Sequence, residues 1–239
     1  MNQTSNSLAS FYPNSLVQTE AASSFLSLAG TETGRKAFLG DTEALDQGAA
    51  PYITMAHIAM RDGVQTVGRL FSDATRTEVA KHEAAQIVAE RTIEQLQKSK
   101  ASIVEHAEHL LSSAQNEAND GFRLNPERRF VQEQILNHLR TLASKPEGFV
   151  ELRKILDEDS EAAAVFASTK GYLLGMSSES HKAIHFKLIE KHLPHVWAKM
   201  GAGAELFKLP ASYDKAINSV RTSFYNPAMA AKASTRVRI

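Results

Sequence analysis

The chain has 239 residues, of which 43% are hydrophobic and 23% are charged, and its formal net charge is zero. This composition is typical of a globular protein and argues against disorder throughout the chain. Cysteine is absent, which excludes disulfides, thiolate metal ligands and cysteine nucleophiles. No run of about 18 apolar residues occurs, so we expect a soluble protein without a membrane-spanning helix.

The first 19 residues contain no charged side chain and are rich in Ser, Asn, Thr and Gln. A Sec signal peptide starts with basic residues and continues with a longer apolar segment, so this leader does not fit one. We predict a polar N-terminal arm over residues 1–50, with short helical pieces. Three interpretations stay open for its beginning: an arm that orders on binding, an uncleaved export signal, or a flexible terminus.

Two helices are predicted after this arm. Apolar residues recur at helical spacing between Pro51 and Phe71, although Gly63 and Gly68 each weaken that helix by about 1 kcal/mol relative to Ala. Thr75 followed by Glu78 has the spacing of a capping box, which predicts the start of a second, longer helix.

The second helix carries a narrow apolar stripe with a heptad repeat and should end near Asn119–Gly121. A helix of about 45 residues would span roughly 65 Å, which is long for a compact domain of this size, so we interpret it as an assembly element. Lys100 is the one charged residue in the stripe. The stripe's a and d positions are Ala89, Ile93, Leu96, Ile103, Ala107, Leu110 and Ala114. The predicted oligomer contacts are Ile93, Leu96, Ile103 and Leu110.

Three short core helices are predicted between residues 125 and 175. Asn125 and Pro126 form a start signal for the first, and Pro146 opens the second. Asp159 caps the third, which Gly175 is expected to close.

The last part of the predicted core, which spans 51–225, contains two more helices. Ser178 starts one that Pro194 should interrupt before a short turn containing Trp197. A Gly-Ala-Gly loop at 201–203 then leads to Pro210 and a helix with a clean apolar face. No window shows strand alternation, so the prediction is an all-α, multi-helix bundle with one long heptad-patterned helix and extended N- and C-terminal arms.

Charge is distributed unevenly along the sequence. Residues 181–239 contain ten Lys or Arg and three acids, a net charge of +7, so residues 1–180 sum to −7. We predict a basic, extended C-terminal arm over 226–239 that contacts an acidic surface, either nucleic acid or a neighbouring copy. The predicted nucleic-acid or partner contacts are Lys208, Lys215, Arg221, Lys232, Arg236 and Arg238.

Histidine clusters are the only candidates for metal chemistry. His181 and His185 are one helical turn apart and His192 lies further along the same face, but no spacing supplies a third and fourth ligand. A second cluster contains Glu105, His106, Glu108 and His109, yet no Glu-x-x-His pair of the kind used by two-metal helical bundles occurs. We therefore predict no metal and no cofactor.

Other catalytic signatures are also missing. The segment 30–36 resembles a phosphate-binding loop in composition only, because its glycines are four residues apart and no Lys-Ser or Lys-Thr pair follows. No sequence context activates a serine nucleophile. The leading hypothesis is a non-enzymatic structural or assembly subunit of a virion or filament. The alternative is a secreted effector that carries an N-terminal export signal and leaves by a non-Sec route, and a third is a helical metal protein or enzyme that uses the His clusters.

Overall fold

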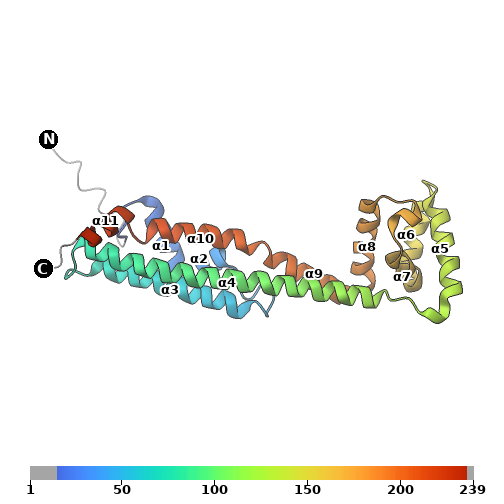
Figure 1. The fold of residues 1–239 in the computed structure, drawn as a ribbon, viewed down its shortest axis with the longest axis horizontal. Coiled ribbons are helices and arrows are strands. Elements are labelled where there is room, and N and C mark those ends of the chain that lie inside the picture. The colour runs from blue at the N-terminus through green and yellow to red at the C-terminus, as the bar shows by residue number, and fades with distance from the viewer. Residues whose placement is uncertain (1–14, 236–239) are drawn as a thin grey trace. The chain divides into compact units, whose positions relative to one another are not determined.

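The computed structural model describes residues 15–235 and is helical throughout, with no strand in that range (Figure 1). The predicted all-α class is confirmed. Within the same range, no helix combines the length and apolar character that crossing a bilayer requires.

The chain forms two compact units rather than one core with two arms. Unit 1 combines the chain up to Ala107 with the chain from Ala204 onward, and unit 2 comprises Glu108–Gly203. Helices α4 and α9 contribute residues to both. The other elements of unit 1 are α1 (Glu20–Gly30), α2 (Glu32–Leu39), α3 (Ala50–Ser72), α10 (Leu209–Ser223), α11 (Pro227–Ala231) and η3 (Lys232–Thr235). Unit 2 contains η1 (Pro126–Arg128), α5 (Arg129–Ala143), α6 (Gly148–Glu158), α7 (Ser160–Ser168), η2 (Gly171–Leu174) and α8 (Ser178–His192). The two shared helices are α4 (Glu78–Gly121) and α9 (Pro194–Leu206).

Residues 15–50 belong to the core of unit 1. The hydroxyls of Thr19 and Thr31 accept N–H groups at the starts of α1 and α2, which fixes both short helices. Both helices pack against α3 and α10 (Figure 1) and bury Phe25, Leu26 and Leu39. The described part of the predicted polar arm is therefore packed structure, and residues 1–14 lie outside the described range.

Helix α4 begins at Glu78, two residues later than the capping box at Thr75 predicted. The hydroxyl of Thr77, not Thr75, accepts the N–H of Ala80 at 3.4 Å, while Thr75 is bonded to Asp73 in the preceding turn. The helix is continuous over 44 residues. Its fully buried residues are Ala85, Ala89, Leu96, Ile103, Ala107, Ala114 and Ala118. The heptad pattern of the stripe stays a prediction.

Gly63 brings α3 close to its neighbours in unit 1. A Cβ at this position would lie 2.5 Å from the hydroxyl oxygen of Thr92 on α4 and 3.0 Å from the ring of Phe224. Thr92 and Phe224 are both buried. Gly68, five residues further along α3, has no atom within 4 Å of such a Cβ. The two glycines that weaken this helix in the sequence therefore differ: one is required by packing and the other is not.

We expect Gly63→Ala and Gly68→Ala to change stability in opposite directions. Gly68→Ala should stabilise the chain by up to about 1 kcal/mol, because alanine restricts the unfolded chain and favours helix. Gly63→Ala should destabilise it by about 1 to 3 kcal/mol, because buried side chains must move. Urea unfolding followed by circular dichroism measures both, and a stabilising Gly63→Ala would contradict the close packing.

The core of unit 2 is formed by α5 to α8 together with the end of α4 and the start of α9. Its fully buried side chains include Leu139, Leu152, Leu156 and Phe166. Asp159 caps α7 as predicted, accepting the N–H groups of residues 161 and 162 at 2.8 and 3.2 Å. The side chain of Asn125 similarly caps the helical turn at Pro126.

Four local predictions are wrong. Gly175 ends η2 rather than α7, which stops at Ser168, and its left-handed φ of 71° suits glycine. The predicted short turn containing Trp197 and the predicted Gly-Ala-Gly loop at 201–203 are both helical and lie inside α9. The C-terminal segment is not extended over 227–235, because Asn226 caps a further short helix whose Ala230 is buried.

Folding removes the charge asymmetry seen along the sequence. Unit 1 contains fifteen Lys or Arg and fourteen Asp or Glu, a net charge of +1, and unit 2 contains twelve and thirteen, a net charge of −1. Unit 1 is nearly neutral because the basic C-terminal segment folds together with the acidic N-terminal segment. An ion pair joins the two segments directly: Nζ of Lys100 on α4 lies 2.7 and 2.8 Å from the carboxylate oxygens of Asp214 on α10.

The two units should respond separately to core mutations. Leu96 in unit 1 and Leu152 in unit 2 are both fully buried, and each Leu→Ala change should cost its own unit about 2 to 5 kcal/mol. The single tryptophan, Trp197, lies in unit 2. The urea midpoint measured by its fluorescence should fall strongly for Leu152→Ala and little for Leu96→Ala, whereas circular dichroism should detect the loss of stability in both variants. Equal changes in the fluorescence midpoint would contradict the expectation that the two units unfold independently.

Candidate functional site

The histidines of α8 lie at the edge of the unit 2 core. The rings of His181 and Phe166 stack with centroids 4.6 Å apart, and those of His181 and His185 with centroids 6.4 Å apart. Nε2 of His181 lies 3.2 Å from the carbonyl oxygen of Phe166, and Nε2 of His192 lies 2.7 Å from that of Leu156. Burial, and to a smaller extent the charge of His181, lowers the pKa of His185. These rings therefore pack and bond within unit 2. Among residues 15–235, no group of three or more His, Asp or Glu is placed to hold a metal ion.

The second predicted cluster is exposed at three of its members, while the fourth, His106, pairs with a distant residue. Glu105 and His109 both point to solvent. Nε2 of His106 instead lies 2.6 Å from a carboxylate oxygen of Asp46. A Cβ at Gly48 would lie 2.5 Å from the ring of His106, so the loop before α3 approaches α4 closely there. Sequence spacing had no means of finding this pair, because sixty residues separate its members.

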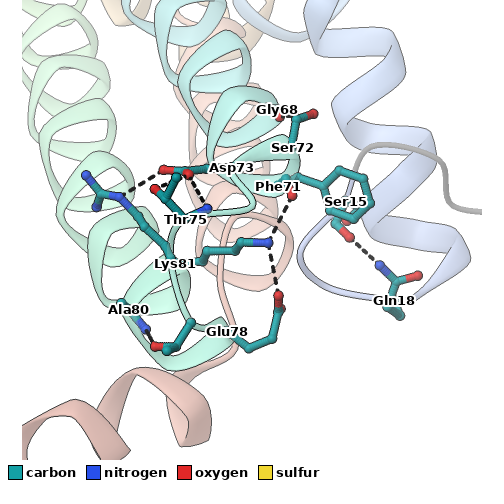
Figure 2. A network of polar contacts seen from close by, with 12 residues as sticks. Ser15, Gln18, Gly68, Phe71, Ser72, Asp73, Thr75, Glu78, Ala80 and Lys81 are labelled. Carbon is teal, nitrogen blue, oxygen red and sulfur yellow. Dashed lines mark hydrogen bonds and ion pairs between the residues drawn. The ribbon is translucent and has the colours of Figure 1, made fainter.

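A buried lysine joins the end of α3 to the start of α4. Nζ of Lys81 donates to the backbone carbonyl of Phe71 at 3.1 Å and to the carboxylate of Glu78 at 3.0 Å (Figure 2). The carbonyls at a helix C-terminus carry partial negative charge, so an ammonium group is favoured there. Asp73 holds the intervening turn by accepting from the N–H and hydroxyl of Thr75 (Figure 2). These hydrogen bonds therefore link the C-terminal end of α3 to the first turn of α4.

His82 connects this end of α4 to the C-terminal segment. Its Nδ1 accepts the backbone N–H of Asn226 at 3.0 Å, and Asn226 in turn caps α11. The ring is buried. Burial lowers the pKa of His82, the Glu78 carboxylate raises it by a smaller amount, and Lys81 lowers it. An acceptor at Nδ1 requires that nitrogen to be unprotonated.

The lowered pKa of His82 makes the stability of unit 1 depend on pH. The histidine of the unfolded state binds the proton more readily, because its pKa is the ordinary value of about 6.5. The contribution of His82 to the free energy of unfolding is therefore fully present above that pH and is lost as the pH falls below it. His82→Asn should reduce the loss between neutral and mildly acidic pH, because the Asn oxygen accepts the same N–H in both conditions. The exposed His138→Asn serves as the control. An unchanged pH dependence in His82→Asn would contradict the assignment.

Four of the predicted basic contacts fall within the described residues: Lys208, Lys215, Arg221 and Lys232. Lys208 is paired with Glu205 at 2.5 Å. Lys215 and Arg221 are exposed on α10, but six residues place them on different faces of a helix. Nζ of Lys232 lies 3.8 Å from the sulfur of Met229, and Arg236 and Arg238 lie outside the described residues. Contact with nucleic acid stays a prediction.

The predicted oligomer contacts differ in exposure. Leu96 and Ile103 are fully buried in unit 1, so another copy would reach them only if the helices separated. Ile93 and Leu110 are half-buried. The one charged stripe position, Lys100, is satisfied by Asp214 within the same unit.

Large apolar side chains are most exposed on unit 2. Phe130 on α5, Val150 on α6 and Tyr172 on η2 are 74%, 79% and 71% exposed, and we refer to them as the exposed trio. In unit 1 the two largest values are about half, at Leu28 and Met55. Helix α6 and η2 both pack against α5. Contiguous exposed apolar patches are typical of surfaces that bind other proteins, and the packing of α6 and η2 against α5 places the exposed trio on neighbouring elements. Sequence periodicity did not single them out.

No protein-family model, curated protein or solved structure matches this chain.

Proposed function

We propose that the chain is a non-enzymatic assembly subunit that associates with further copies of itself through unit 2. The observation that carries the proposal is the exposed trio, whose side chains leave more than two thirds of their surface in solvent. Burying apolar surface is the main favourable term in protein association.

Charge supports self-association as well. The whole chain is neutral, and the two units carry +1 and −1. A large net charge would keep copies apart by mutual repulsion, and this chain has none to oppose an apolar contact. A virion or filament would be one setting for such a subunit.

The test compares two double variants by sedimentation velocity over a wide range of protein concentration. Wild-type protein should sediment faster as concentration rises. Phe130→Ser/Val150→Ser should remain monomeric, because polar side chains remove the apolar area to be buried. Tyr172 is left intact because it also lines a cavity.

The matched control is Leu28→Ser/Met55→Ser, which removes the two most exposed large apolar side chains of unit 1. It should associate like wild type. A wild-type chain that is monomeric at every concentration, or equal loss of association in both double variants, would overturn the proposal. Circular dichroism of each variant establishes that its helices are intact.

A further inference from the structure

A cavity in unit 2 combines positive charge with unused hydrogen-bond donors. Its volume is about 470 Å³, and it is walled by the segment from the end of α7 through η2 and by the first turn of α8. This volume lies within the range of small-molecule sites. Its wall contains the lysines 170 and 182, the hydroxyl residues Ser168, Thr169, Tyr172 and Ser178, and also Met176 and His181.

Local backbone geometry produces the cavity. Gly175 adopts a left-handed φ of 71°, and the N–H of Met176 donates to the carbonyl of Gly171 at 2.9 Å, so the chain turns sharply before α8. Gly171 itself lies against α8, because a Cβ there would be 2.8 Å from Cβ of His181. Packing at Gly171 thus holds η2 close to the first turns of α8.

The polar groups of the wall divide into two sets. The hydroxyls of Ser168 and Thr169 donate to the carbonyls of Phe122 and Val165, and Nε2 of His181 is paired with the Phe166 carbonyl. These groups are already used by the fold, and His181 is stacked between Phe166 and His185.

The second set is free to bind a ligand. Among the described residues, Lys170 and Lys182 form no ion pair, and the hydroxyls of Tyr172 and Ser178 form no hydrogen bond. No acidic side chain lines the cavity. Two lysines and two hydroxyl residues therefore line one hollow, and the lining has a net charge of +2.

We infer that this cavity binds a small molecule carrying a phosphate group. A phosphate monoester carries a charge of about −1.5 to −2 at neutral pH and three strong acceptor oxygens, which matches two lysines and two hydroxyl donors. Lysine binds phosphate as a point charge, whereas a planar carboxylate is better matched by arginine. The ring of Tyr172 and the thioether of Met176 would contact an apolar part of the ligand. The inference does not depend on self-association.

The test titrates wild-type protein with inorganic phosphate and with phenyl phosphate, using amide chemical shifts as the readout. Shifts should be confined to residues 167–182, and phenyl phosphate should bind more tightly, because its ring adds an apolar contact. Lys170→Gln/Lys182→Gln should weaken both by more than about tenfold. Tyr172→Phe should weaken binding less while retaining the preference for phenyl phosphate.

The matched control is Lys154→Gln/Lys191→Gln, which removes two exposed lysines that form no ion pair and do not line the cavity. It lowers the net charge by the same amount and should bind like wild type. Absence of shifts at 167–182, or equal weakening in both double variants, would overturn the inference, since the second result indicates only general attraction to a positive surface. Unchanged spectra of the unliganded variants establish that the cavity has not unfolded.

Discussion

The burial of one side of α4 is the constraint on which the rest of the fold depends. Its fully buried residues run from Ala85 to Ala118 and include both small and large apolar side chains. Those up to Ala107 belong to unit 1, while Ala114 and Ala118 belong to the core of unit 2. A helix with an apolar stripe this long is stable only if other elements cover it along its length. Both units therefore gather partners around the same helix.

Polar residues along α4 are matched by partners from distant parts of the chain. Lys81 binds a carbonyl at the end of α3, His106 pairs with Asp46, and Lys100 pairs with Asp214. Each pairing uses a polar residue on or beside the buried side of the helix, where an unsatisfied group would be costly. Unit 1 is nearly neutral because the basic segment 204–239 shares it with the acidic segment 1–107.

Unit 2 carries the two candidate binding features of the molecule, the exposed trio and the cavity. Its exposed trio is not covered by the chain itself, and the cavity between η2 and α8 retains donors without acceptors. One feature favours contact with a protein surface and the other favours a small anion. Tyr172 belongs to both, so a ligand in the cavity would lie beside the surface proposed for assembly. The two proposals nevertheless rest on separate side chains: Phe130 and Val150 for assembly, Lys170 and Lys182 for the anion.

The sequence by itself determined the helical class, most helix starts and the buried side of α4, because caps and apolar periodicity act over a few residues. It identified Asn125 and Asp159 as caps, and it placed the helix that follows Pro51. Only the tertiary structure decided the division into units, since that depends on which distant segments meet. It also decided that Gly63 is required and Gly68 is not, that 201–203 is helical, and that Lys170 and Lys182 line one hollow. Those outcomes depend on packing between elements, on which local sequence patterns carry no information.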